Sequence, residues 1–464
     1  MLFSSSVFLL LFLPIILLLY FNPWFRSRKF RNVVLLIASI FFYAWGEPVF
    51  VFLMLASIII NWLISLQIEK SVSAKKGWLI LSVVLNIGVM FVFKYLMFAV
   101  ENVNHIFGSN LAVPEIQLPI GISFFTFQIL SYIFDVYYGN VSAQPKCYKF
   151  ALYVSMFPQL VAGPIVRYSQ IADEIDNRVE TRSEFNGGIV RFCWGLGKKV
   201  IFSNYMGILA DNAFYLAEQG DISVVMAWIG AIAYTAQIYY DFSGYSDMAI
   251  GLGKIFGFHF QENFNFPYVS KSITEFWRRW HISLSSWFRD YVYIPLGGSR
   301  VKAGRAVLNT FIVWLLTGIW HGANWTFIVW GLGYFVLLMF ERKFKLTKGM
   351  KYIGHIYTLF FVNLLWVVFR ADNLTLAGDY IAHMFGKSGV FLDASTMSCM
   401  RGSWFVLLLA MIFSVPVGDY VAEKFKIKEN VRNNFRIGMA LPIFIVCLAK
   451  CIVSAYNPFI YFNF

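Results

Sequence analysis

Long stretches without charged residues are the feature that most limits how this chain can fold. Several approach the ~20 consecutive apolar residues that a helix needs to cross a bilayer, and the first runs from about Val7 to Phe21. Only 14% of the 464 residues are charged, whereas soluble domains carry about a quarter. We therefore predict an all-α integral membrane protein, because a helix satisfies its own backbone hydrogen bonds in lipid.

Basic residues lie in short loops between these stretches and give a formal net charge of +13. In a soluble protein this charge would suggest nucleic acid, but here it is explained by the loop lysines and arginines that orient membrane proteins. The clusters at 26–31 and 424–436 predict loops on the inside, with both termini outside. The first stretch lacks a basic leader and a cleavage site, so we expect it to be retained. We predict one multi-pass domain over 1–464, although the stretch from about 150 to 242 does not predict a unique topology.

The cysteine pattern predicts neither a metal site nor a disulfide framework. None of the five cysteines stands at metal-ligand spacing from a histidine. We expect the cysteines to pack in the protein interior and no metal to take part.

His321 lies between two apolar arms of about 306–320 and 325–340. An arm of about 15 residues covers roughly 22 Å at the helical rise, less than the bilayer's hydrocarbon core of about 30 Å. His321 is therefore predicted at membrane depth, beside Asn324, where ionisable residues are costly and often functional. A neutral imidazole there can take a proton from an attacking hydroxyl. A packed histidine bonded to a carbonyl is an equal alternative on position alone.

The segment 275–291 is too charged to span and too aromatic to be a free loop, so we predict an interfacial or re-entrant amphipathic helix. His281 lies in it. Arginines can hold the phosphates of a nucleotide-bearing donor, and glycines in the turn at 295–300 allow backbone amides to approach phosphates. The simpler alternative is anchoring at lipid headgroups. The arginines of this segment are Arg278, Arg279 and Arg289.

Asp241 and Asp247 interrupt an apolar run. Buried carboxylates need partners, so pairing with the arginines of 275–291 is the expected arrangement. A role in shaping a donor site is the alternative.

Several segments together resemble the membrane-bound O-acyltransferase family, and within it the branch that contains the alginate O-acetylation membrane subunit. The resemblance covers essentially the whole chain, including Leu160-Val-Ala-Gly-Pro-Ile165 and both ends. The segments that carry it most specifically are Tyr240-Asp-Phe-Ser-Gly-Tyr-Ser-Asp-Met248, Phe276-Trp-Arg-Arg-Trp-His-Ile-Ser-Leu-Ser-Ser-Trp-Phe-Arg-Asp-Tyr291, Ile294-Pro-Leu-Gly-Gly298 and Trp320-His-Gly-Ala-Asn-Trp325.

The resemblance implies a ring of tilted transmembrane and re-entrant helices around a central funnel, with the family core at about 120–370. It implies that His321 is catalytic and that His281 is a second essential site residue, with Trp320, Asn324 and Asp241 shaping the site. It also implies cytoplasmic acetyl-CoA as donor substrate, a bacterial cytoplasmic membrane, and an extracytoplasmic partner with a serine nucleophile that acetylates a polysaccharide. Transfer of D-alanine or another acyl group to a wall polymer is the alternative within the family.

The chain ends in an aromatic segment, 457–464. One reading is an aromatic anchor at the membrane interface. The other is a tail that folds back toward His321, so that the Tyr461 hydroxyl, activated by a base, carries the acyl group to the partner. The segment resembles the C-terminal motif of a small partner in teichoic acid D-alanylation, where such a tyrosine is proposed as carrier.

Two functions without covalent chemistry compete with acyl transfer: a polysaccharide transporter and a scaffold that recruits the partner. A transporter would favour paired, interrupted helices in two related halves, which the sequence does not show. A scaffold has no need of histidines at membrane depth. The sequence does not identify the polysaccharide.

Overall fold

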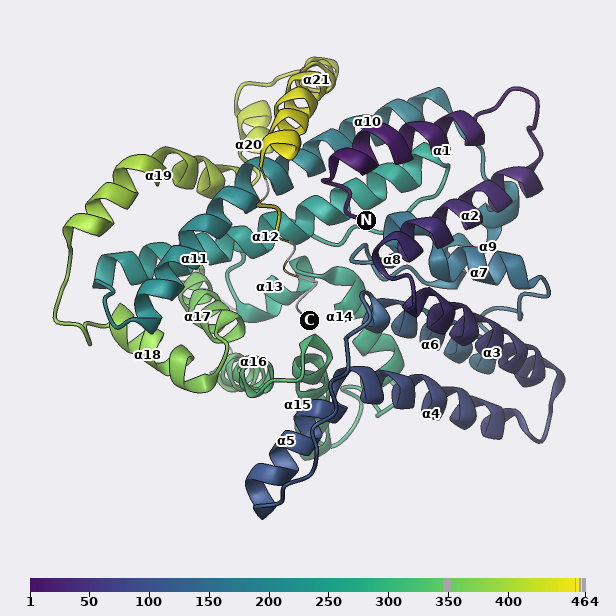
Figure 1. The fold of residues 1–464 in the computed structure, drawn as a ribbon, viewed down its shortest axis with the longest axis horizontal. Helices are drawn as coiled ribbons and strands as arrows, with labels where there is room; N and C mark the ends of the chain where they lie inside the picture. Colours follow the sequence, from purple (N-terminus) through teal and green to yellow (C-terminus); the bar gives the residue numbers. More distant parts are fainter. Residues whose placement is uncertain (345–351, 455, 459, 461–464) are drawn as a thin grey trace. The chain divides into compact units, whose positions relative to one another are not determined.

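The computed structural model describes residues 1–344, 352–454, 456–458 and 460, and within these every regular element is a helix (Figure 1). The prediction of an all-α protein is confirmed. The chain divides into two compact units, 1–192 with 248–261 and 193–247 with 262–464. The chain passes between them three times: within α10 (Arg182–Gly197), within α12 (Val224–Ile255), and between residues 261 and 262. The single-domain prediction stays a prediction.

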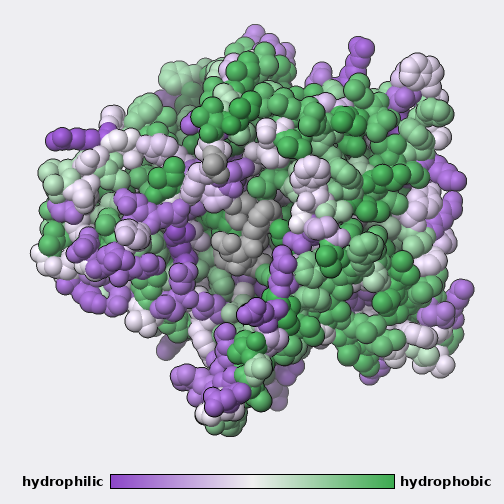
Figure 2. All heavy atoms as spheres, viewed as in Figure 1, coloured by the Kyte–Doolittle hydropathy of each residue, from purple (hydrophilic) through white to green (hydrophobic). Residues whose placement is uncertain are grey.

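Seven helices of the described chain are long and apolar enough to cross a membrane. Many of their large hydrophobic side chains are exposed, such as Phe52 and Leu441, and Figure 2 shows broad hydrophobic areas on the surface. Such exposure requires lipid contact, so the chain is a multi-pass membrane protein. The seven are α2 (Arg28–Gly46), α3 (Phe50–Lys70), α4 (Lys75–Lys94), α15 (Ala303–His321), α17 (Ile353–Arg370), α19 (Ala394–Phe413) and α21 (Glu429–Val453).

In the first unit, α3, α4 and α6 pack against one another, and α2 packs against α1 and α7 (Figure 1). Between α3 and α4, the buried side chains of Asn61, Ser82 and Asn86 form hydrogen bonds of 2.7–3.2 Å. Polar bonds of this kind hold helices together where lipid gives no hydrophobic drive. The other elements are η1 (Phe8–Phe12), α1 (Leu13–Tyr20), α5 (Leu96–Phe107), α6 (Ile122–Tyr138), α7 (Cys147–Ser155), α8 (Phe157–Leu160) and α9 (Tyr168–Asn177).

In the second unit, α15 and α16 form a tightly packed hairpin. A Cβ atom added at Gly318 would lie 2.6 Å from the carbonyl oxygen of Phe327, and one added at Gly331 would lie 2.6 Å from that of Trp314. Only glycine permits this approach. The other elements are η2 (Lys198–Ser203), α11 (Asn204–Glu218), η3 (Pro267–Val269), α13 (Ile273–Arg279), α14 (Ile282–Phe288), η4 (Arg289–Tyr293), α16 (Trp325–Phe344), α18 (Leu374–Met384) and α20 (Val417–Lys424).

The last predicted span begins earlier than expected. The helix α21 starts at Glu429, so Arg432 and Arg436 of the predicted basic loop lie on its first turns. The span was predicted from its apolar residues, and a helix can extend beyond these into polar turns. The two arms predicted around His321 are confirmed as α15 and α16.

Candidate functional site

His321 is the last residue of α15 and is buried. Its imidazole lies edge-on to three aromatic rings, those of Trp320, Trp330 and Phe369, at centroid distances of 5.0, 4.9 and 5.2 Å. These rings come from α15, α16 and α17. The helix end thus places a titratable group in an aromatic enclosure of the second unit.

His281 is fully buried and lies at a break between two seven-residue helices, α13 and α14. The prediction of one amphipathic helix over 275–291 is wrong, because His281 has a φ of 43°, in the left-handed region. That conformation costs a non-glycine residue roughly 1–2 kcal/mol, and such strain concentrates at functional sites. Periodicity in a sequence does not reveal a single left-handed residue.

The side chain of Asn263 holds this break and determines the tautomer of His281. Its Oδ1 accepts from the backbone N–H of Ser283 at 3.2 Å and from the Ser283 hydroxyl at 2.9 Å. A backbone N–H can only donate, so the atom facing it is the amide oxygen. The Nδ1 of His281, 3.2 Å from the same oxygen, must then carry the proton. The lone pair of the imidazole is left on Nε2.

The two histidines are linked through Trp320. Its ring lies 6.0 Å from that of His281 and 5.0 Å from that of His321. Within the described chain, His281 Nε2 and Trp330 Nε1 are buried without a hydrogen-bond partner. A buried polar atom left unsatisfied costs about 1–3 kcal/mol, so both atoms are suited to bind a polar group. The enclosure therefore offers an imidazole lone pair and an indole N–H donor.

The three arginines of the predicted donor side are exposed or partly exposed, whereas His281 and His321 are buried. Arg278 and Arg289 are exposed. Arg279 pairs with Glu275 at 2.9 Å, and Arg289 pairs with Asp290 at 2.6 Å. Each pair is between sequence neighbours, so these arginines do not serve the aspartates of α12.

The expected pairing of Asp241 and Asp247 with those arginines is wrong. Asp241 pairs with Lys199, and Asp247 pairs with Lys198, both at 2.6 Å. Both lysines belong to the π-helical segment η2. Two adjacent lysines inside an apolar run are the feature of the sequence that could have indicated these partners.

Two residues that the sequence did not single out hold the surroundings in place. Asn263 has been described above. Glu341 of α16 is buried, and its carboxylate accepts from the backbone N–H groups of Ile273 and Thr274 at 2.5 and 3.0 Å. These are unpaired donors at the start of α13, so α16 fixes the helix that leads into His281.

Asn324 acts on the loop that follows His321. Its Nδ2 donates to the carbonyl of Asp372 at 2.7 Å, and its Oδ1 accepts from the N–H of Thr326 at 3.0 Å. It shapes the turn into α16. Tyr461, the predicted acyl carrier, lies outside the described residues.

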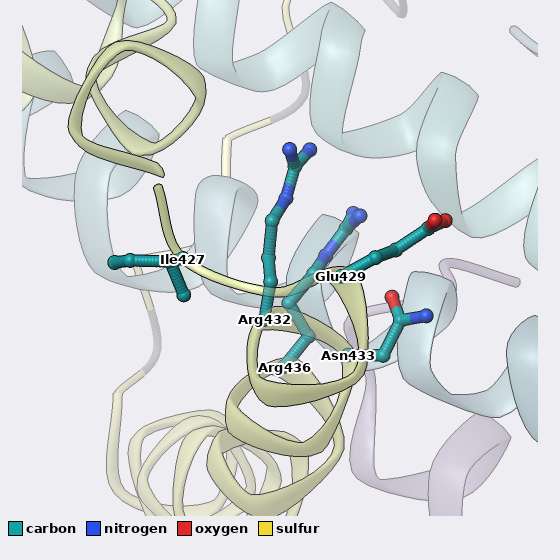
Figure 3. A pocket seen from close by; sticks show the side chains of 5 residues that line it. All are labelled: Ile427, Glu429, Arg432, Asn433 and Arg436. Carbon is teal, nitrogen blue, oxygen red and sulfur yellow. The ribbon is translucent and has the colours of Figure 1, made fainter. Parts of the chain in front are cut away.

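A surface hollow of about 290 Å³ lies at the start of α21 and contains no histidine. Its lining residues are Ile427, Glu429, Arg432, Asn433 and Arg436 (Figure 3). The long side chains of Glu429, Arg432 and Arg436 extend from the first turns of the helix into the open space (Figure 3). It contains neither His281 nor His321, so this hollow is not the candidate catalytic site.

The model of the membrane-bound O-acyltransferase family matches residues 37–377. The chain is 45% identical to a protein named probable alginate O-acetylase AlgI from Azotobacter vinelandii, over 100% of both chains. It is 37% identical to a peptidoglycan O-acetyltransferase of Helicobacter pylori, over 84% of this chain and 81% of that one. It is 30% identical to a teichoic acid D-alanyltransferase of Bacillus subtilis, over 50% of this chain and 62% of that one. The matched residues include His281 and His321, and the chain belongs to the membrane-bound O-acyltransferase family and is a multi-pass acyltransferase.

Proposed function

We propose that this enzyme takes an acetyl group from cytoplasmic acetyl-CoA and passes it across the membrane for O-acetylation of an extracytoplasmic polysaccharide. The observation that carries the proposal is the pair of buried imidazoles, His321 and His281, linked through Trp320 in an aromatic enclosure. The names of the more similar relatives favour acetyl over D-alanyl transfer, since identity is 45% to the alginate acetylase and 30% to the D-alanyltransferase. Alginate is the proposed polymer, and peptidoglycan is the alternative that the Helicobacter pylori relative supports.

His321 is the proposed general base. The acceptor hydroxyl attacks the carbonyl carbon of the thioester as the imidazole removes its proton. The carbon–sulfur bond then breaks, and the proton passes from the imidazolium to the departing thiolate, so that free CoA leaves. The Trp330 N–H, buried beside the His321 ring, is a suitable donor to the oxyanion that forms. His281, with its lone pair on Nε2, is the second proposed site residue.

Tyr461 is the proposed acceptor and carrier. A phenol is a weak nucleophile at neutral pH and needs an adjacent base. The aryl ester has a good leaving group, so a serine of an extracytoplasmic partner can attack it and return the proton to Tyr461. The preceding residue, Ile460, is buried in the hydrophobic core of the second unit, the same core to which Trp330 and Phe369 belong.

The donor side is proposed to face the cytoplasm, at the arginines of 275–291. Arg278 is exposed and available to phosphates, and Arg289 is exposed but pairs with Asp290. Basic loops at 26–31 and 424–428 support the same orientation, with both termini outside a bacterial cytoplasmic membrane.

The test uses purified full-length protein in nanodiscs with radiolabelled acetyl-CoA. We expect CoA release and an acetyl ester on Tyr461, located by peptide fragmentation. His321→Ala should lower the rate by about 10²–10⁴-fold, the usual loss for a general base. His281→Asn removes the imidazole but suits the left-handed backbone, so a lost rate there does not arise from backbone strain. Tyr461→Phe should abolish the ester.

His355→Gln is the matched control. His355 of α17 is half-buried and its Nδ1 lies 3.2 Å from the Ser270 carbonyl, a contact that glutamine can keep. We expect wild-type CoA release from this variant. Near-normal release from His321→Ala would remove the proposed base, and acetylation that survives Tyr461→Phe would leave the tail as an aromatic anchor.

A further inference from the structure

A fully buried ion pair joins η2 to α12 in the second unit. Lys199 Nζ and Asp241 Oδ1 are 2.6 Å apart, and their side chains are 2% and 1% exposed. Taking both charges out of water is expensive and is often not repaid by their mutual attraction. A buried pair at this cost calls for a reason beyond stability.

Each partner of the ion pair also binds the main chain near the C-terminus. Lys199 Nζ donates to the carbonyl oxygen of Pro458. Asp241 Oδ2 accepts from the N–H of Ile460 at 2.9 Å. The pair therefore holds two main-chain groups that are two residues apart. These hydrogen bonds do not involve the side chains of Pro458 or Ile460.

A second attachment lies just upstream. The Tyr456 hydroxyl donates to Asp211 Oδ2 at 2.6 Å, and Arg370 donates to the other oxygen of the same carboxylate. Arg370 is the last residue of α17 and follows Phe369, whose ring contacts His321. The described part of the tail is thus fixed at three points, Tyr456, Pro458 and Ile460.

The position of Lys199 is itself unusual. It lies in a six-residue π-helical segment between α10 and α11. Segments of this type are rare and frequently mark functional sites. A side chain that must reach both a carboxylate of α12 and a carbonyl of the tail is a physical reason for such a local distortion.

We propose that Lys199 and Asp241 are positioning residues that dock the C-terminal segment inside the second unit, and so set where its last residues lie during acyl transfer. The importance of this docking for the reaction rests on the proposed function, in which Tyr461 carries the acyl group. The docking itself does not depend on that chemistry, because it is made by main-chain groups before Tyr461.

The test measures how accessible position 460 is. In full-length protein with the five native cysteines replaced by serine or alanine, Ile460→Cys should react slowly with a maleimide, because Ile460 is only 8% exposed. Adding Lys199→Met with Asp241→Leu removes both charges together, so neither is orphaned. We expect labelling to become about tenfold faster or more, as for a segment released to solvent.

The neighbouring pair supplies the matched control. Lys198 and Asp247 are also 2.6 Å apart and come from the same two elements, with side chains 29% and 18% exposed. Lys198→Met with Asp247→Leu should leave the labelling rate of Ile460→Cys unchanged. Equal rates in both double variants and the parent would overturn the docking role.

A second variant leaves the ion pair intact. Ile460→Pro removes the N–H that Asp241 accepts and also fixes φ and replaces the side chain, whereas Ile460→Val changes the side chain but keeps the N–H. We expect kcat for acetyl transfer to fall in Ile460→Pro with the KM for acetyl-CoA unchanged, and Ile460→Val to behave as the parent. If Ile460→Pro keeps its kcat, docking has no role in transfer. If Tyr461→Phe remains active while the labelling result holds, the carrier hypothesis fails and the docking pair stands.

Discussion

Asn263 Oδ1 lies 3.2 Å from His281 Nδ1 and also accepts from the main chain of Ser283. The Nδ2 of Asn263 donates a hydrogen bond to the Ser246 hydroxyl at 3.1 Å. One asparagine thus connects α12, the loop before α13 and the break before α14. The orientation of the second imidazole depends on a residue 18 positions earlier in the chain.

Asn263 variants should therefore alter catalysis through His281. In Asn263→Ala the imidazole loses the acceptor that fixes its tautomer, and we expect kcat to fall with the KM for acetyl-CoA little changed. In Asn263→Asp a carboxylate would favour the protonated imidazole, so the pH at which activity appears should shift upward. Both are measured as CoA release against pH. If CoA release by Asn263→Asp depends on pH in the same way as in the parent, the protonation of His281 does not limit the reaction.

Glu341 should be needed for the position of α13. Glu341→Ala leaves the buried N–H of Ile273 and the partly buried N–H of Thr274 without their acceptor, at about 1–3 kcal/mol for the buried donor. We expect a lower unfolding temperature in detergent together with reduced CoA release. Thr274→Val is the milder comparison, since it removes only the hydroxyl that donates to Glu341 at 2.7 Å and keeps both main-chain donors. Equal damage from both variants would contradict a capping role.

Arg278 should contribute to donor binding rather than to stability. It is exposed, and Asp241 and Asp247 of α12 pair with lysines instead. We expect Arg278→Ala to raise the KM for acetyl-CoA several-fold with an unchanged unfolding temperature. Arg279→Ala provides the comparison, because it breaks a partly exposed pair with Glu275, which is worth about 1 kcal/mol at most. An unchanged KM in Arg278→Ala would favour anchoring at lipid headgroups.

His259 of the first unit should make stability depend on pH. Its two ring nitrogens lie 2.5 Å from Glu184 and 2.6 Å from Glu174. The hydrogen bond to Glu184, with a further contribution from Glu174, raises the pKa of His259 above 6.5, although partial burial opposes this. The stabilisation is fully present below pH 6.5 and is lost as the pH rises through the raised pKa.

The corresponding experiment compares unfolding temperatures of His259→Gln and the parent at two pH values. The variant should be less stable below pH 6.5, and the difference should disappear above the raised pKa. The effect should be small, because the His259 side chain is 50% exposed and solvent screens such pairs. A difference that is independent of pH would assign the loss to packing.

Much of the fold could be predicted from the sequence because a helix that crosses a bilayer needs about 20 consecutive apolar residues. The arms around His321 follow from it directly, as does the multi-pass character. The candidate histidines were also visible, since ionisable residues stand out in apolar surroundings. The link between them was not, because it depends on the ring of Trp320 and on a single left-handed residue at His281.

The charge pairs show where sequence reasoning fails. The sequence predicts the arginines of 275–291 as partners for Asp241. In the folded chain, Lys199 is the residue that pairs with Asp241. Asn263 and Glu341 could not be found at all, since nothing in their local sequence distinguishes them from other polar residues. Their roles arise from contacts between segments 18 and 67–68 residues apart.

The contact between Gly318 and the carbonyl of Phe327 has a mechanical consequence. Two helices that touch through their backbones cannot slide or spread without losing that contact, so α15 and α16 behave as one stiff lever with His321 at its tip. In the proposed function, substrate and product must nevertheless enter and leave a buried enclosure. We therefore expect any opening motion to occur in the neighbouring short helices, α13 and α14, where the backbone already turns sharply, while the hairpin remains a fixed reference for the chemistry.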